Sequence, residues 1–198
     1  MKRIATFIAM VALVAVANAA SINWSISLGR SGKITDSTGA NLAGSIYLVL
    51  SSDVAALEAA SSVSDFEQLL SSDESNSTPP LATVTVTAGK PSPSSGTASS
   101  SRLTAGTEYT YAFVVYDNST KKFYVSGTAT EAAFDPNSTD ESLKVEKSIS
   151  FTTDHIGSTY ASSDDWGTAG SGGETIPEPA TGALALAGVA LLFKRRRA

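Results

Sequence analysis

Cysteine is absent from this chain of 198 residues, and histidine occurs once, as His155. The absence of cysteine excludes a thiol nucleophile, a thiolate metal site and an iron–sulfur cluster. A single histidine without cysteine also excludes the histidine- and cysteine-based sets that bind zinc, and the spacing around His155 defines no Ser-His-Asp triad. We therefore predict no catalytic residue, no cofactor and no metal site.

Positive charge is scarce in the middle of the chain. Between residues 20 and 176 there are 8 basic and 18 acidic residues, a net charge of −10, and the other six of the 14 basic residues lie near the two ends. An acidic domain repels the phosphate groups of nucleic acids. We therefore predict no nucleic-acid partner.

Long hydrophobic runs are also missing, because no apolar run reaches the roughly 20 residues that cross a bilayer as a helix. Two shorter runs lie near the ends. The first, residues 4–17, has 14 residues, follows Lys2 and Arg3, and is interrupted only by Thr6. A basic start followed by such a stretch is typical of a secretory signal peptide. The alternatives are an uncleaved N-terminal anchor and a buried helix.

A cleavage site follows this first run. Ala17 and Ala19 form a small-x-small pattern directly before Ala20, and signal peptidase recognises such a pattern. We predict residues 1–19 to be a signal peptide that directs the chain to the secretion translocon. Signal peptidase then cuts between Ala19 and Ala20, or one residue to either side.

The second apolar run, residues 180–193, carries no charge and follows Pro177, Glu178 and Pro179. The two prolines favour an extended chain around Glu178, which is a form that a processing enzyme can bind. As a helix, these 14 residues measure about 21 Å, against a hydrocarbon core of about 30 Å. The run therefore spans a membrane only with local thinning.

Four basic residues follow the second run: Lys194, Arg195, Arg196 and Arg197. The positive-inside rule keeps such a cluster in the cytoplasm. We therefore predict that the tail, residues 177–198, stops transiently in the inner membrane through residues 180–193 and holds the preceding domain outside.

This order of elements, together with the N-terminal signal, resembles the PEP-CTERM sorting domain of exopolysaccharide-producing Gram-negative bacteria. The matching residues are Pro177, Glu178 and Pro179, then the apolar run, then the basic cluster at 194–197. The resemblance covers only residues 177–198. It implies processing near the motif by a membrane enzyme of the exosortase type, and delivery to the cell surface or extracellular matrix alongside exopolysaccharide.

Two alternatives apply to this tail. Residues 178–182 look like a sortase LPxTG motif with Glu178 in place of leucine. That leucine normally fills an apolar pocket, where a buried carboxylate would be costly. The other alternative is a plain tail anchor that is never cut.

Residues 20–160 show the alternation and turn signals of a mainly β domain. Strands are predicted at residues 22–28, 45–50, 81–88, 108–116, 121–126 and 143–151. Asp53 is a possible cap for a helix at 54–60, and residues 64–67 fit a capping box for a second one. Residues 89–101, rich in Pro, Ser and Gly, are predicted as an exposed loop.

The predicted fold class is an antiparallel β-sandwich with one or two short helices, flanked by N- and C-terminal hydrophobic helices. Residues 20–160 form the β-sandwich domain, and residues 161–176 form a flexible linker of Gly, Ser and Asp. The sorting signal then occupies 177–198.

Three weaker patterns lie in the middle of the chain. Residues 135–146 faintly echo a calcium loop, but Asp140 replaces the glycine required at the sixth position. Aromatic rings near Asp164 and Asp165 offer the elements of a sugar site: Trp24, Tyr109, Tyr111 and Trp166. Packing is the stronger explanation, with Trp24 and the two tyrosines in the core or in cross-strand pairs and Trp166 as an anchor for the tail. Asn-Ser-Thr triplets occur at Asn76, Asn118 and Asn137, and Glu74 gives the first the stricter bacterial acceptor form.

The sequence thus favours a non-enzymatic exported surface or matrix protein associated with exopolysaccharide. Two alternatives stay open. One is an exported glycan-active enzyme that uses Asp and Glu side chains. The other is a surface protein that keeps its C-terminal membrane anchor uncleaved.

Overall fold

The structure, a computed structural model, describes residues 19–28, 32–73, 76, 78–152 and 166–172. The described residues leave out most of the predicted signal peptide (including Ala17), His155, the predicted sorting motif, the apolar run 180–193, the basic residues 194–197 and the predicted flanking helices. Within the described part, neither helix has the length and apolar character needed to cross a membrane.

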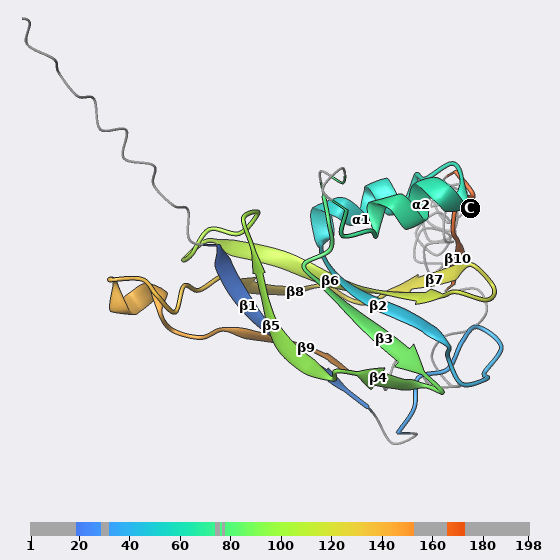
Figure 1. The fold of residues 1–198 in the computed structure, drawn as a ribbon, viewed down its shortest axis with the longest axis horizontal. Helices are drawn as coiled ribbons and strands as arrows, with labels where there is room; N and C mark the ends of the chain where they lie inside the picture. The colour runs from blue at the N-terminus through green and yellow to red at the C-terminus, as the bar shows by residue number, and fades with distance from the viewer. Residues whose placement is uncertain (1–18, 29–31, 74–75, 77, 153–165, 173–198) are drawn as a thin grey trace, which may run out of the picture.

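The described chain is mainly β with two short helices (Figure 1). Its strands are β1 (Ala20–Ser27), β2 (Gly44–Leu50), β3 (Ala82–Thr87), β4 (Lys90–Ser92), β5 (Ser95–Ser100), β6 (Glu108–Asp117), β7 (Lys122–Val125), β8 (Ala129–Ala132), β9 (Ser148–Thr152) and β10 (Gly167–Thr168). The helices are α1 (Ser51–Glu58), α2 (Val63–Leu69) and the 3₁₀ turn η1 (Glu141–Leu143).

The strands form two sheets. One has seven strands, in the order β10-β7-β6-β2-β3-β4 with β8 paired to the first half of β6, and all of its pairs are antiparallel. The other has three strands in the order β5-β1-β9. Its β1–β9 pair is parallel, which corrects the prediction of a fully antiparallel fold. Strand β1 is central because it pairs with β5 on one side and β9 on the other, and both partners are distant segments of the chain.

Two hydrophobic clusters lie on the two faces of the seven-stranded sheet, because alternate residues of a strand point to opposite faces. In β2, Ile46 and Leu48 join the cluster shared with the three-stranded sheet. Val49 joins the cluster under α1 and α2. The first cluster includes a stacked pair, Phe113 and Phe151, with ring centroids 5.1 Å apart. The helices therefore cover one face and the three-stranded sheet covers the other.

Several predicted elements are confirmed. The strand at 45–50 is central, paired on both sides by β6 and β3. The hairpin is β6 and β7, paired from Val114 to Asp117. The alternation at 22–28 corresponds to β1, which buries Ile22, Trp24 and Ile26.

Two segments differ from the prediction. Residues 89–101, predicted as an exposed loop, contain β4 and β5, and β5 pairs with β1 along its whole length. Gly96 favours this pairing because the Trp24 ring occupies the space of its missing side chain. In 143–151, only Ser148–Thr152 is a strand. Val145 is 54% exposed, and the residues before it form the turn η1, which Asp140 caps.

Both helix caps also differ from the prediction. Helix α1 begins at Ser51, directly after β2, so Asp53 lies in its first turn and caps nothing. Helix α2 is capped by Ser62, whose hydroxyl accepts a hydrogen bond from the Asp65 backbone N–H at 3.0 Å. Residues 64–67 therefore lie inside the helix. The serine-rich sequence offers several equivalent caps, and the packing of Phe66 selects among them.

Residues 166–172, which we call the strap, correct the described part of the predicted 161–176 linker. Trp166 and Ala169 are 5% and 3% exposed, and β10 within the strap pairs with β7. The Trp166 ring packs against Tyr124, with centroids 6.0 Å apart. The Gly- and Ser-rich composition conceals this anchor, and the folded body extends to Gly172.

Candidate functional site

The predicted processing site lies at the start of the fold. Ala19 is exposed, whereas Ala20 is the first residue of β1, is 1% exposed and pairs with Ser100. Ser21 exchanges two backbone hydrogen bonds with Phe134, of 2.7 and 2.9 Å. A cut before Ala20 therefore leaves β1 whole, and a cut further along would remove paired residues.

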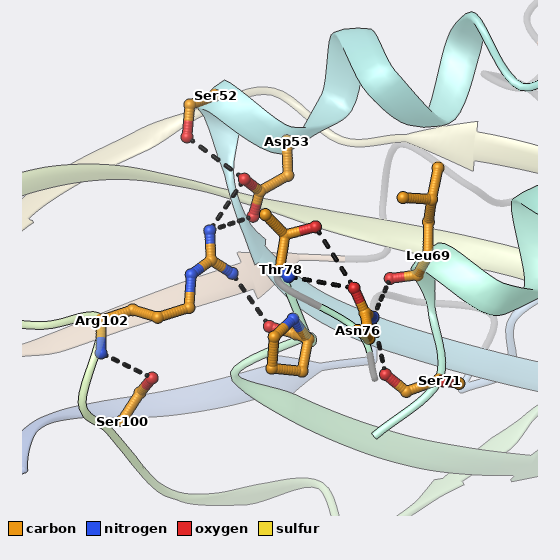
Figure 2. Close-up of polar contacts among 9 residues, drawn as sticks. Ser52, Asp53, Leu69, Ser71, Asn76, Thr78, Ser100 and Arg102 are labelled. Atoms are coloured by element: carbon orange, nitrogen blue, oxygen red, sulfur yellow. Dashed lines mark hydrogen bonds and ion pairs between the residues drawn. The ribbon is translucent and has the colours of Figure 1, made fainter. Parts of the chain in front are cut away.

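The most extensive polar cluster joins α1 to the segment 78–80 and to the loop after β5 (Figure 2). The Arg102 guanidinium donates to both carboxylate oxygens of Asp53, at 2.8 and 2.7 Å, and to the Pro79 carbonyl at 2.9 Å. The two charged side chains are only 19% and 11% exposed. This Arg102–Asp53 clamp satisfies its own charges, so it acts as a structural tie.

Asn76, also drawn in Figure 2, ties the loop after α2 to the end of that helix. Its amide donates to the carbonyls of Leu69 and Ser71, at 2.9 and 2.8 Å, and its oxygen accepts from the Thr78 N–H at 3.0 Å. Leu69 is the last residue of α2, so Asn76 satisfies a carbonyl that the helix leaves unpaired. Asn76 is 9% exposed. Asn76, the asparagine of the triplet with the stricter acceptor form, is therefore buried and hydrogen-bonded within the fold. Asn118 and Asn137 are exposed.

A third cluster joins α2 to the β6–β7 hairpin. Glu67 Oε1 accepts from the Tyr116 hydroxyl and from Lys121 Nζ, both at 2.8 Å. The hydrogen bond from Lys121 lowers the pKa of Glu67 the most, and the one from Tyr116 lowers it further. Burial and the bond to Glu67 raise the pKa of Tyr116. Glu67 and Lys121 are both partly exposed, at 44% and 43%, so screening by water keeps their interaction weak.

Asp117 organises the turn between β6 and β7. It is 1% exposed. Its carboxylate accepts from the backbone N–H and the hydroxyl of both Ser119 and Thr120, at 2.6 to 3.4 Å. Burial alone would raise the pKa of Asp117, but the hydrogen bonds from Thr120 and Ser119 outweigh it and lower the pKa. Both carboxylate oxygens therefore accept hydrogen bonds from the turn itself.

The aromatic residues considered for a sugar site do not form one surface. Trp24 is 5% exposed, Trp166 is 5% exposed and Tyr111 is 1% exposed, and all three belong to the cluster between the sheets. Burial, with the nearby Tyr109 and Glu131, raises the pKa of Tyr111 to about 12. The interpretation of these rings as core residues is confirmed. Asp164 and Asp165 lie outside the described residues.

The segment that echoes a calcium loop folds through its own hydrogen bonds. Asp135 accepts from the Asn137 N–H at 2.9 Å, and Asp140 accepts from the N–H and hydroxyl of Ser142 at 2.9 and 2.7 Å. Across the described ranges, no three acidic or histidine side chains converge on a point that would hold a metal ion.

The outer face of the three-stranded sheet is lined by hydroxyl and amide side chains, a feature that the predictions missed. Its residues are Asn23, Ser25, Ser27, Ser95, Thr97, Ser99, Ser148 and Ser150, together with Ser21, which is only 4% exposed. The register aligns them in rows across the sheet, such as Thr97, Asn23 and Ser148. The period-two repeat of Ser and Thr in each strand was the available signal. The strands themselves carry no charged residue.

No family model, no curated protein and no solved structure matches the chain.

Proposed function

We propose that this chain is a non-enzymatic exported protein of the cell surface or extracellular matrix, sorted by its C-terminal segment. Residues 177–198 act as a PEP-CTERM-like signal: residues 180–193 stop in the inner membrane, 194–197 stay in the cytoplasm, and an exosortase-like enzyme cuts near Pro177, Glu178 and Pro179. The body, an antiparallel β-sandwich in its main architecture, is then released to the surface among exopolysaccharide.

The observation that carries this proposal is the order of elements at the two ends. Residues 177–197 contain a Pro-Glu-Pro motif, a short apolar run and a basic cluster in that order, and residues 2–19 combine a basic start, a short apolar run and a small-x-small pattern. The start of the fold supports the same processing, because β1 begins at Ala20, directly after the predicted cut.

The polar contacts of the body support a non-enzymatic role. The carboxylates of Asp53, Asp117 and Asp140 are each engaged by a guanidinium or by neighbouring N–H and hydroxyl groups. A glycosidase needs two carboxylates that face a substrate from a shared cleft. A display domain instead needs a filled core and a solvated surface, and its uncharged hydroxyl rows suit contact with the hydroxyl groups of a polysaccharide.

The test is the intact mass of the protein recovered from an exopolysaccharide-producing cell that makes the processing enzyme. We expect the mature protein to begin at Ala20 and to lack residues 180–198. Replacing Glu178→Ala should leave residues 180–198 attached. The matched control is Glu174→Ala, which removes a glutamate four residues before the motif residue and should be processed normally.

Other masses would contradict the proposal. A wild-type protein that keeps residues 180–198 would be a plain tail anchor. Processing of the Glu178→Ala variant at the wild-type rate would show that the motif is not recognised. Release of reducing sugars from exopolysaccharide by the purified protein would favour the enzyme alternative.

A further inference from the structure

We propose that, while the tail is held in the membrane, the domain stands on its strap end and presents the opposite end outward. The strap end consists of the strap, the turn at 59–62 between α1 and α2, and the first residues of β7. This inference rests on the proposed membrane tail, and it adds a defined orientation of the body and a surface that faces lipid.

The strap is attached to the body at both of its ends. Trp166 is buried in the main cluster, and Ala169 is buried under α2. Backbone hydrogen bonds run from the Ala169 N–H to the Lys121 carbonyl and from the Gly172 N–H to the Ala60 carbonyl, both at 2.9 Å. The folded part of the chain therefore reaches Gly172.

Gly170 makes the closest approach within the strap. A Cβ atom at this position would lie 2.2 Å from the backbone carbon of Ser62 and from the nitrogen of Val63, and its φ is +76°. Gly172 also has a positive φ, +68°, but the nearest atom to its Cβ position is 4.0 Å away. A side chain at Gly170 would therefore collide with the backbone of Ser62 and Val63, whereas one at Gly172 would meet no close atom and only the strain of its positive φ.

The remaining tether is short. From Gly172 to Ala180, where the apolar run begins, there are eight residue steps, which reach at most about 26–29 Å when fully extended. A flexible chain of this length has a typical end-to-end distance of about 16 Å. A domain of this size has a radius of gyration of about 15 Å and is about 40 Å across. The tether is therefore too short for the domain to turn over freely above the membrane.

The orientation follows from where the strap lies. In Figure 1 the strap strand β10 and helix α2 lie at one end of the long axis, and the segment with η1 lies at the other. A tether at the strap end keeps the 59–62 turn near the lipid surface. The η1 segment and its exposed neighbour Val145 then point away from the membrane.

The test uses energy transfer from single fluorophores to the lipid surface, which the absence of cysteine makes simple. Residues 20–198 are reconstituted into phosphatidylcholine vesicles that contain a rhodamine-labelled lipid headgroup. The label is placed by Ala59→Cys in the strap end or by Val145→Cys at the far end, both exposed positions. We expect energy transfer at least about twofold higher from position 59, because the two ends of such a domain are tens of ångströms apart.

Two changes should remove this difference. An insertion of about 20 Gly and Ser residues after Gly173 lengthens the typical reach of the tether to about 30 Å and should make transfer from the two labels nearly equal. Gly170→Ala should do the same by releasing the strap, whereas Ser171→Ala, at the neighbouring position without a positive φ, should keep the difference. The insertion leaves the described fold untouched, so it decides the matter even where Gly170→Ala fails to fold.

The outcomes separate the inference from the proposal beneath it. Protein that does not associate with the vesicles overturns the membrane tail itself. Protein that associates but gives equal transfer from both labels before insertion overturns the orientation and leaves the tail in place. A twofold difference that survives the insertion also overturns the inference, because the tether would not be its cause.

Discussion

The helix-covered side of the molecule and the three-stranded sheet differ in what their polar side chains do. On the helix side, Arg102, Asn76 and Glu67 hold helices and loops through side-chain hydrogen bonds. In the three-stranded sheet, backbone pairing between the strands supplies most of the hydrogen bonds, and exposed side-chain pairs such as Thr97 with Asn23, at 2.7 Å, lie on its outer face.

The difference has a simple physical origin. Strands satisfy their backbone N–H and C=O groups by pairing, whereas short helices and loops leave carbonyls without partners. Leu69, Ser71 and Pro79 offer such carbonyls, and the side chains of Asn76 and Arg102 supply the donors. Polar substitutions should therefore be costly on the helix side and nearly neutral on the outer face of the three-stranded sheet.

The largest effect is expected from Phe66→Ala. Phe66 is fully buried and contacts the rings of Tyr116 and Phe123, with centroids 5.2 and 4.8 Å apart. Its loss should lower the free energy of unfolding by about 3–5 kcal/mol, measured by urea denaturation. Val145→Ala, at an exposed position, should change it by less than about 0.5 kcal/mol. Equal effects of the two would show that the helices contribute little to the fold.

Arg102→Ala should have the next largest effect. The change leaves the Asp53 carboxylate, 11% exposed, without its partner, and we expect a loss of about 2–3 kcal/mol in the free energy of unfolding. Thr97→Val is the comparison in the three-stranded sheet. It removes an exposed hydrogen bond to Asn23 and should cost less than about 0.5 kcal/mol. A larger loss in the free energy of unfolding for Thr97→Val than for Arg102→Ala would contradict the expected difference between the two regions.

Asn76→Asp tests the second helix-side tie with almost no change in volume. It replaces the NH₂ group, which donates both hydrogen bonds, by one carboxylate oxygen that faces the carbonyls of Leu69 and Ser71, and we expect a loss of about 2 kcal/mol. The matched control is Asn137→Asp, an exposed asparagine in the same kind of triplet, with an expected change below about 0.5 kcal/mol. Similar thermal midpoints for the two variants would contradict the structural role of Asn76.

The smallest effect concerns Glu67 and depends on pH. Because its pKa is lowered on folding, its contribution to stability is complete above the ordinary value of 4.5 and is lost as the pH falls through the folded pKa. Glu67→Gln should cost less than about 1 kcal/mol at pH 7, and the difference from the wild type should shrink below pH 4.5. A stability difference between the variant and the wild type that grows as the pH falls would show that another group causes the effect.

Local patterns predicted much of the fold. Alternation located β1, and the apolar run at 45–50 identified the central strand β2. The turn at Asp117 identified the hairpin. Strand β5 was missed because its Ser and Gly content is typical of loops, and only pairing with β1 some 75 residues earlier makes it a strand. The strap was missed for the same reason, because Trp166 is anchored by the distant Tyr124.

The polar ties were less predictable than the strands. Nothing in the local sequence connects Asp53 with Arg102, which lie 49 positions apart. Asn76 stood out as a modification triplet, but its burial depends on how the loop after α2 folds back on the helix. Side-chain hydrogen bonds between distant segments have no periodicity, so sequence patterns do not reveal them.

The sequence by itself determined the buried and exposed faces of strands such as β1, because an alternation of period two acts locally. The export and sorting signals at the two ends are predictions from the same kind of local pattern, a short apolar run beside basic residues. The tertiary structure alone decided which strands meet, that β1 lies between β5 and β9, and that the fold continues to Gly172. Those outcomes depend on contacts between residues far apart in the chain, whose free energies exist only once the sheets have come together.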